Sequence, residues 1–382
     1  VIGYFLLGGY TTEWFSQFDN EEPNSYKLDA YRKYMNNPDI EIPGKDKLEQ
    51  PKEQILLKDN IEEVINYRKF HNKTVSNLVL YFAHEAQNEL NHNKILGLFF
   101  GYILELVYDR MWYAGHIEFD DINHSNDIDL LATPSSYQFR AFDQAGGYML
   151  LADSLEINNK ACFVSFDHTT FLVPNLPNNK ERLCNDPETE EALKRLALMR
   201  ITNKKDLLVD RPQTIQAMRR EFMQRIYKRF GYWWFDMLEG WFYDDELMNE
   251  VKHQVELSKR IMNVDKESNS EVAVFYSGQS LYYMNKMSEI NTETICTQRD
   301  GLGRMGSPYD TYSLGDLDKV DIFKEFIFDY SIWFIGKCIL ILSGSLEVTG
   351  KPIEIRIVCV FYKCIHSIIV FMVSRNRIII SC

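Results

Sequence analysis

A chain of 382 residues, 45% of them hydrophobic and 14% aromatic, is long enough to bury one large core or two smaller ones. Its 42 Lys and Arg residues against 55 Asp and Glu residues leave a net charge of −13, which argues against nucleic acid as a partner because phosphates are bound by basic surfaces. The seven cysteines include no CxxC pair, so we expect no zinc site, no disulfide framework and no cofactor, and a reducing, cytoplasmic environment.

Short apolar runs alternate with helical patterns over the first two thirds of the chain. The runs are VIGYFLLG at position 1, ILGLFFGYILE at 95, IDLLATPSSY at 128, ACFVSFDHTT at 161 and YWWFDM at 232. Helical patterns are predicted over 28–35, 59–91, 148–155, 187–200, 212–229 and 245–262. Short strands that are apolar on both faces and are joined by helices are typical of a parallel sheet.

The polar side chains at the strand ends indicate which of the folds with a parallel sheet the chain adopts. Active sites of (β/α)8 TIM barrels form at the carboxyl ends of the strands. Five strands are too few to close such a barrel, so we expect 1–265 to be its C-terminal portion, strands four to eight. The other three strands would then precede Val1, in agreement with the missing initiator Met. A doubly wound sheet is the competing fold, although no Gly-rich phosphate loop follows any of the runs.

The remainder of the chain divides into two parts. A polar linker at 266–270 precedes a small α/β domain over 271–321, with strands from Glu271 and Tyr309 and a helix near 291–305. The apolar tail, 322–382, holds two stretches of nearly membrane-span length, but charged residues inside them are expensive in hydrocarbon. A membrane-spanning tail, further strands of the second domain and the product of a shifted reading frame stay open; we do not expect a membrane partner.

Glu13 is the first candidate for chemistry, because it follows the first apolar run and precedes Trp14. Retaining glycosidases need two carboxylates about 5 Å apart, one as acid/base and one as nucleophile. Apolar, aromatic surroundings raise the pKa of a carboxyl group and suit it to the acid role. The simpler alternative is that Glu13 caps the loop or pairs with a lysine.

A set of motifs in one order along the chain resembles a known family. They are GYTTEWF, FFGYILELVYDRMWYAGH, DIDLLATPSSYQFR, AGGYMLLADSLEINNK, CFVSFDHTTFL and GYWWFDMLEGWF. Together they resemble the glycoside hydrolase family forty-two β-galactosidases, and SLYYMNK with TQRDGLGRMGSPYDTYSLGDL resembles the second domain of that family, which supports trimers. The resemblance spans about Val1 to Val320. It implies retaining hydrolysis of a terminal β-galactoside or related sugar, with a carbohydrate as the substrate and a homotrimer as the assembly.

The resemblance also implies roles for individual residues. It makes Val1–Gly8 strand four and Glu13 the acid/base, although Thr12 precedes Glu13 where many relatives have Asn. The nucleophile is expected as a Glu on strand seven, but Ser165 stands there. A serine without an adjacent base is a poor nucleophile and carries no charge for an oxocarbenium ion, so activity is expected to be impaired.

Two alternatives follow from Ser165. Asp167 lies two residues further on the same strand face and could replace the nucleophile, or it could merely orient its neighbours. The chain could also be a non-catalytic carbohydrate-binding barrel derived from a glycosidase. A weaker third possibility is a scaffold tethered to a membrane by its tail.

Further side chains near the strand ends are candidates for binding the sugar. The substrate-binding candidates are Trp14, Glu105, Tyr137, Arg140, His168 and Trp241. Glu239 could also bind sugar hydroxyls, and Trp112 could stack on a sugar ring. The plainer roles are ion pairing for the glutamates and core packing for the tryptophans. His84, His92 and His253 lie on predicted helices and are expected to be solvated, and no metal constellation is evident.

Overall fold

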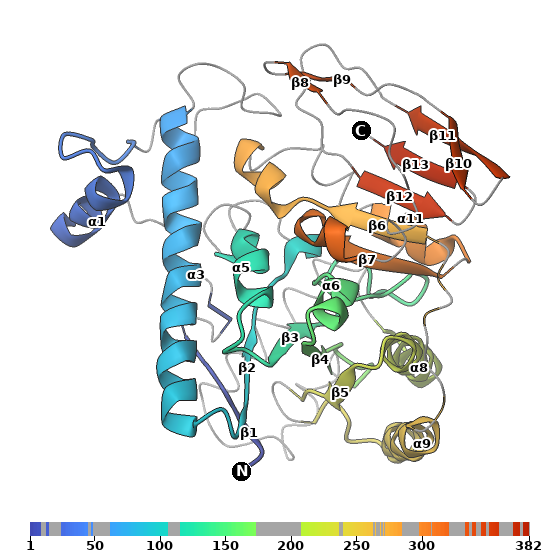
Figure 1. Cartoon of the computed structure of the whole chain (residues 1–382). Coiled ribbons are helices and arrows are strands. Elements are labelled where there is room, and N and C mark those ends of the chain that lie inside the picture. Colours follow the sequence, from blue (N-terminus) through green and yellow to red (C-terminus); the bar gives the residue numbers. More distant parts are fainter. Residues whose placement is uncertain are drawn as a thin grey trace.

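The computed structural model describes residues 1–8, 13–14, 24–44, 47–48, 62–105, 115–172, 208–236, 240–262, 264, 268, 270, 272–284, 298–306 and 308–320, and the backbone of six strands between 333 and 381. Within these ranges the chain is a mixed α/β structure with two main sheets (Figure 1). The elements of the first sheet come first in the chain, and those of the second follow.

The first sheet contains all five strands that the apolar runs predict. They are β1 (Gly3–Phe5), β2 (Ile95–Phe99), β3 (Leu130–Pro134), β4 (Ala161–Phe166) and β5 (Gly231–Trp234). They lie side by side in chain order, and each is parallel to its neighbour. A doubly wound sheet reverses its strand order at a switch point, so this curled sheet is instead consistent with part of a TIM-like fold.

Helices connect the strands much as the sequence predicts. Their bounds are α1 Ser25–Met35, α3 Glu62–Leu90, α5 Phe119–Asn123, α6 Ala152–Ile157, α8 Arg211–Tyr227, α9 Asp245–Ile261 and α11 Gln298–Arg304. The 3-10 turns are η1 Ile103–Glu105, η2 His116–Glu118, η5 Gly278–Tyr283 and η7 Leu314–Lys319. Asp210 and Asp244 cap α8 and α9 by accepting backbone N–H bonds in the first turn. The helix predicted over 187–200 lies outside the described residues.

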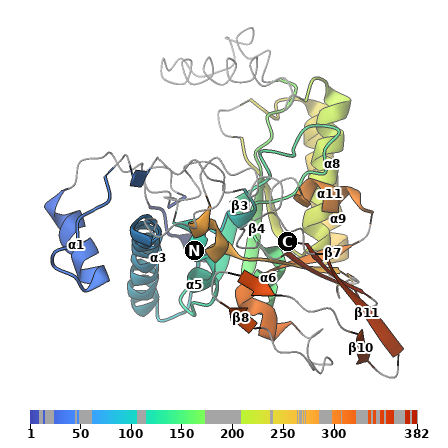
Figure 2. The same ribbon diagram turned by 90° about the horizontal axis from the view of Figure 1, so that it is seen from above.

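The outer face of the first sheet is covered by helices. Viewed from above, α3 and α5 lie on one side of the strands, and α8 and α9 on the other (Figure 2). Leu96 and Leu98 of β2 pack in one apolar core with Val79 and Ala83 of α3. Phe166 of β4 belongs to a second core formed with α8 and α9. Strands buried in this way explain why the runs are almost continuously apolar.

The inner face carries a cluster of aromatic rings from four strands. The ring of Trp233 lies 6.4 Å from that of Phe5, 6.0 Å from that of Phe99 and 5.7 Å from that of Phe163. A Cβ atom at Gly231 would stand 1.8 Å from the Phe163 ring, so only glycine leaves room for this ring beside β5. These rings fill the centre of the curled sheet and leave its carboxyl edge for polar groups.

The second sheet has the strand order β10-β11-β13-β12-β6-β7. The strands β6 (Val272–Tyr276) and β7 (Tyr309–Ser313) are parallel and confirm the two that the sequence predicts here. The remaining four come from the apolar tail: β10 (Ser345–Val348), β11 (Lys351–Val358), β12 (Val370–Ser374) and β13 (Arg377–Ser381). The tail also forms the pair β8 (Trp333–Ile335) and β9 (Cys338–Leu340).

The described strands of the tail agree with one of the three possibilities, further strands of the second domain. β12 pairs antiparallel with β6, so the tail joins the sheet directly. Among the described residues, none of the helices combines the length and apolar character needed to cross a membrane.

A buried ion-pair network joins the two sheets. Lys228 Nζ, just after α8, lies 2.7 Å from Asp153 Oδ1 on α6 and 2.6 Å from Asp310 Oδ1 on β7. The backbone N–H of Thr311 donates to the other oxygen of Asp153 over 2.6 Å. Val274 and Tyr276 of β6 also share the core that contains Leu96 and Leu98, so the second sheet packs on the first.

Candidate functional site

The Glu13 side chain is held by residues that follow β2. Tyr102 donates its hydroxyl proton to Glu13 Oε1 over 3.0 Å, and the Tyr102 ring is 3% exposed. Burial and the nearby Glu13 charge raise the pKa of Tyr102 well above its usual range, so this hydroxyl remains a donor at neutral pH. Glu13 is thus positioned at the carboxyl edge of the sheet, as the sequence predicts.

His116 fixes the backbone of Glu13. The backbone N–H of Tyr102 donates to His116 Nδ1 over 3.2 Å, so Nδ1 is the unprotonated ring nitrogen. The proton must then be on Nε2, which lies 2.8 Å from the carbonyl oxygen of Glu13 and donates to it. The ring is fully buried and packs at 4.4 Å from the ring of Phe100. A neutral histidine of one tautomer therefore anchors the segment that carries Glu13.

Asp167, just beyond β4, stands in a second polar group. Tyr137 donates its hydroxyl proton to Asp167 Oδ2 over 2.7 Å. Arg140 lies with its Nη1 atom 3.6 Å from Asp167 Oδ1 and its guanidinium 4.4 Å from the centre of the Tyr137 ring. Within the described residues, Asp167 Oδ1 is buried and receives no hydrogen bond, so Arg140 is the charged group nearest to this oxygen.

The two carboxylates face a shared pair of tyrosines. Tyr102 bonds Glu13, and the Asp167 charge also contributes to its raised pKa. Tyr137 bonds Asp167, and the Glu13 charge likewise contributes to its raised pKa. Each carboxylate thus lies within electrostatic range of the tyrosine that binds the other. The geometry brings together Glu13, Asp167, Tyr137 and Arg140, four of the residues that the sequence singled out.

The environment of Asp167 changes its acidity. The side chain is 3% exposed, and burial raises its pKa to about 6. Arg140 and the Tyr137 hydroxyl oppose this shift because both favour the charged carboxylate. Asp167 is therefore mostly ionised at pH 7, yet it can take up a proton within the range in which enzymes work.

Ser165 lies on the same face of β4 as Asp167 and is 3% exposed. Its carbonyl oxygen accepts hydrogen bonds from the backbone N–H and the hydroxyl of Ser135, over 3.1 and 2.8 Å. The described part of the chain shows no histidine or carboxylate hydrogen-bonded to the Ser165 hydroxyl, so the arrangement of an activated serine nucleophile is absent there.

Glu105 lies close to the site, but its oxygens already have partners. The structure places it in η1 rather than at the end of a strand. Oε1 accepts the backbone N–H groups of Tyr137 and Gln138 over 2.6 and 2.7 Å, and Oε2 is 3.0 Å from Arg299 Nη2. Glu105 therefore holds the loop that carries Tyr137. These contacts favour the plainer role of an ion-pair partner over the predicted sugar contact.

Three other candidates for binding the sugar are buried, and the described contacts favour the plainer role of core packing. His168 is 1% exposed, stacks on Phe166 at 4.4 Å, and has its Nε2 atom 3.7 Å from Glu221 of α8, so it faces the helices. Trp241 is 1% exposed and packs in the core between β4, α8 and α9. Trp14 is 5% exposed, and its indole N–H donates to the carbonyl oxygen of Leu6. All three contribute to packing, because strand alternation and loop direction turn them away from the polar edge.

Sequence reasoning missed Tyr102, His116 and Arg299. Tyr102 lies inside the motif FFGYILE and His116 closes the motif that ends in YAGH, so the signals were a tyrosine three residues after β2 and an isolated histidine. Arg299 comes from α11, far along the chain, and only the fold brings it to Glu105. Trp112 and Glu239, which were considered beside the other candidates, lie outside the described residues.

Comparison of the chain with models of protein families, with curated proteins and with solved structures gives no match. The geometry of the site is therefore the basis for the function.

Proposed function

We propose that this protein is a glycoside hydrolase of the β-galactosidase type, and that Glu13 and Asp167 are its catalytic carboxylates. The observation that carries the proposal is the arrangement of the two carboxylates around Tyr102 and Tyr137 at one edge of a curled parallel sheet. Two carboxylates in different environments are what acid-assisted glycoside cleavage needs. The resemblance to family forty-two enzymes supports the same assignment.

Glu13 would act as the acid/base. Its protonated form gives a proton to the glycosidic oxygen as the bond to the anomeric carbon breaks, and its ionised form then takes a proton from the water that enters. The Tyr102 hydroxyl donates to Glu13 Oε1 and orients the carboxyl group. The buried His116 keeps the main chain of Glu13 in place.

Asp167 would act as the nucleophile in place of the expected glutamate. Its charged oxygen attacks the anomeric carbon, the aglycone leaves with the proton from Glu13, and water then hydrolyses the glycosyl ester. Asp167 is shorter than glutamate by one methylene, so the sugar must approach the edge of β4 more closely. Arg140 and Tyr137 favour the ionised form that this step requires.

A non-catalytic carbohydrate-binding protein is the second candidate. The observation that favours it is Ser165, an uncharged and buried side chain at the position where the resemblance leads us to expect the nucleophile. In that case Asp167, Tyr137 and Arg140 would bind sugar hydroxyls without attacking the anomeric carbon.

Hydrolysis of a chromogenic β-galactoside separates the two candidates. Turnover by the parent chain that is lost in Asp167→Asn supports the enzyme with Asp167 as nucleophile. No turnover by the parent, but turnover by Ser165→Glu, supports the binding protein. Turnover by the parent that survives Asp167→Asn rejects Asp167 as the nucleophile. His253→Gln is the matched control, because His253 is an exposed residue of α9 that contributes no hydrogen bond to the site residues described above.

The resemblance also leads us to propose a homotrimer built on the second domain. Light scattering on the purified chain tests this proposal. A mass of three chains would support it, and a monomer at the same concentration would reject it.

A further inference from the structure

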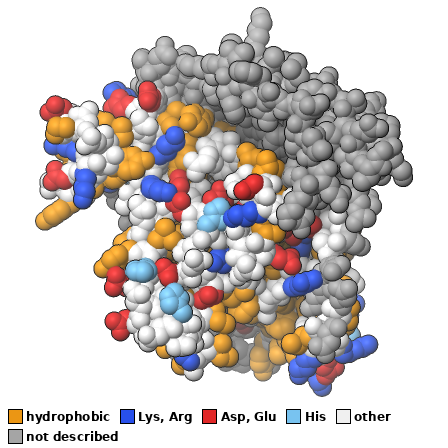
Figure 3. All heavy atoms as spheres, viewed as in Figure 1, with side chains coloured by type: hydrophobic (Ala, Val, Ile, Leu, Met, Phe, Trp, Pro, Cys, Tyr) orange, Lys and Arg blue, Asp and Glu red, His pale blue; other side chains and the backbone are white. Residues whose placement is uncertain are grey.

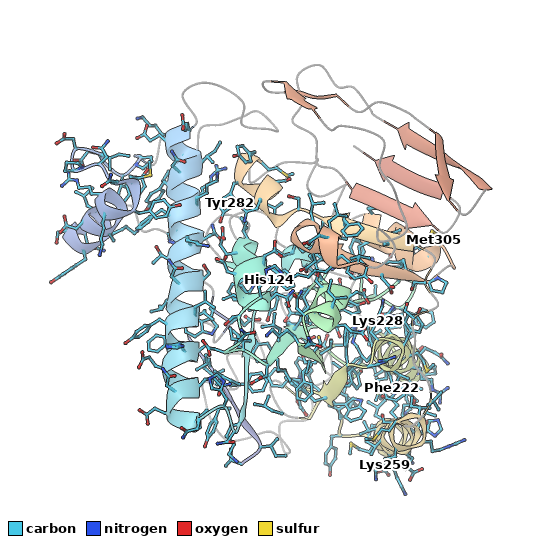
Figure 4. The ribbon with its side chains drawn as sticks, in the orientation of Figure 1. His124, Phe222, Lys228, Lys259, Tyr282 and Met305 are labelled. Carbon is cyan, nitrogen blue, oxygen red and sulfur yellow. The ribbon has the colours of Figure 1, made fainter. Side chains whose placement is uncertain are left out.

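A second group of chemically active side chains lies outside the proposed catalytic site, where α5 meets η7. His124, which follows α5, lies with Nε2 at 2.7 Å from Asp316 Oδ1 of η7. Asp120 of α5 completes the group, and one nitrogen or oxygen of each of the three side chains lies within 4.8 Å of the others. Figure 4 labels His124 beside α5, on the side that faces the second sheet.

Asp316 is fully buried, although it is ionisable. Its Oδ1 atom is surrounded by donors: His124 Nε2, Asn158 Nδ2 at 3.1 Å and Lys319 Nζ at 3.0 Å. Within the described residues, its Oδ2 atom is buried and receives no hydrogen bond. A buried carboxylate oxygen left without a partner is costly, and it points to a ligand that the side chains alone do not supply.

Asp120 also has a buried carboxylate oxygen without a partner. Its Oδ1 atom receives no hydrogen bond from the described residues. Against the effect of burial, side-chain hydrogen bonds from Ser313 and Ser154 act to lower the pKa of Asp120 and Asp316, respectively, yet Asp120 Oδ1 and Asp316 Oδ2 themselves stay without a partner among the described residues. Two carboxylates with open oxygens therefore lie next to one imidazole.

We propose that Asp120, His124 and Asp316 bind one divalent transition-metal ion, with Zn²⁺ as the best matched. Imidazole nitrogen together with carboxylate oxygen suits Zn²⁺, whereas Mg²⁺ prefers oxygen ligands alone. Ligands of a tetrahedral Zn²⁺ ion lie about 3.4 Å apart for bonds of roughly 2.1 Å. His124 Nε2 and Asp316 Oδ1 are 2.7 Å apart and all three ligand atoms lie within 4.8 Å of one another, so small side-chain movements would bring them to this spacing. The ion would join α5, which precedes β3 of the first sheet, to η7, which follows β7 of the second sheet.

The site is reachable from solvent. The His124 side chain is 36% exposed and that of Lys319 is 38% exposed. On the face of the molecule shown in Figure 3, histidine side chains lie at the surface among acidic and basic groups. Lys319 occupies the position of a competing cation, and its exposed chain can turn toward water when a metal ion enters.

Titration of the full chain with Zn²⁺ at pH 7.5, followed by calorimetry and by thermal unfolding, tests the proposal. We expect His124→Gln to lose one equivalent of bound Zn²⁺ relative to the parent. The parent should gain about 5 °C in Tm at saturating Zn²⁺, and His124→Gln should gain none. His253→Gln, which removes an exposed helix histidine near glutamates, should behave as the parent does.

Lys319→Met distinguishes a metal site from a simple ion-pair network. Removing a positive charge that lies 3.0 Å from Asp316 Oδ1 should tighten Zn²⁺ binding by roughly tenfold. If the group is only a network of ion pairs, Lys319→Met would lower Tm without any rescue by Zn²⁺.

The proposal is overturned if His124→Gln binds as many Zn²⁺ equivalents as the parent, or if His253→Gln loses the same equivalent. It is also overturned if Zn²⁺ leaves the Tm of the parent unchanged. The exposed position of His124 makes its variant the one most expected to fold, and circular dichroism of each variant confirms folding before titration. Asp316→Asn, measured in parallel, should lose the same equivalent.

Discussion

Tyr137 donates a 2.7 Å hydrogen bond to Asp167 Oδ2, and it does so from a loop that Glu105 and Arg299 hold in place. The bond favours the ionised carboxylate, whereas burial opposes it and raises the pKa of Asp167 to about 6. The balance between these effects determines the pH range in which Asp167 is ionised, as its proposed role as nucleophile requires.

Activity on a galactoside should fall as the pH drops through about 6. The carboxyl group of Asp167 is protonated below its pKa, and the protonated form cannot attack the anomeric carbon. Tyr137→Phe removes a hydrogen bond that lowers this pKa, so the acid limb should move upward by about one pH unit. The measurement is kcat/KM between pH 4.5 and 8. An acid limb at the same pH in both proteins would show that another group controls it.

Glu13→Gln should reduce the rate of hydrolysis by a factor that depends on the leaving group. A poor leaving group needs a proton, so kcat on an alkyl galactoside should fall by roughly 10²–10⁴-fold. A dinitrophenyl leaving group needs none, so bond cleavage should be much less affected. Tyr102→Phe is the matched control, because it removes the orienting bond and keeps the carboxyl group. Equal losses on both substrates would argue against the acid role.

Gly8→Ala should destabilise the segment that carries Glu13. A Cβ atom at Gly8 would stand 2.6 Å from the Trp14 ring, which is buried and cannot move freely. We expect a loss of about 1–3 kcal/mol in the free energy of unfolding, measured in urea. Gly44→Ala is the control, because nothing lies within 4 Å of a Cβ atom there. Equal effects of the two substitutions would mean that Trp14 does not pack over Gly8.

Lys228→Met should weaken the contact between the two sheets in a pH-dependent way. It leaves Asp153 and Asp310 buried without their cation, which we expect to cost about 3–5 kcal/mol at pH 8. The pKa of Asp153 is raised to about 6 by burial and rises further without Lys228. Because this folded-state pKa exceeds the unfolded value of 3.8, the folded variant takes up a proton first, and its stability should recover as the pH falls from 8 to 5.

Urea unfolding at the two pH values measures this effect. Lys252→Met on the exposed face of α9 is the control and should change little at either pH. A loss for Lys228→Met that is the same at pH 5 and pH 8 would contradict a network built around Asp153.

Much of the first sheet could be predicted from the sequence, because strands of a parallel sheet are buried on both faces and read as apolar runs. The carboxyl edge followed from the same pattern, and Glu13 and Asp167 lie there, where their catalytic role remains a prediction. The strand order agrees with the part of a TIM barrel that the sequence predicts, although the apolar runs alone do not reveal which strands are neighbours. The tail strands were equally ambiguous, because apolar runs of that length fit a sheet or a membrane span.

Individual side chains were harder to predict than strands. His168 is one residue from Asp167, and the alternation of a strand is enough to turn it toward α8. Glu105 lost its predicted role through contacts with Arg299, a partner 194 residues away in the chain. Such contacts depend on the packing of distant elements, which local patterns do not describe.

The most direct test of the central claim is covalent trapping with a 2-deoxy-2-fluoro-β-galactosyl fluoride, followed by peptide mass spectrometry. The fluorine slows hydrolysis of the glycosyl ester, so the sugar accumulates on the nucleophile. The account predicts one labelled peptide with the sugar on Asp167, and no label in Asp167→Asn. A label on another residue, or no label in the parent chain, would contradict it.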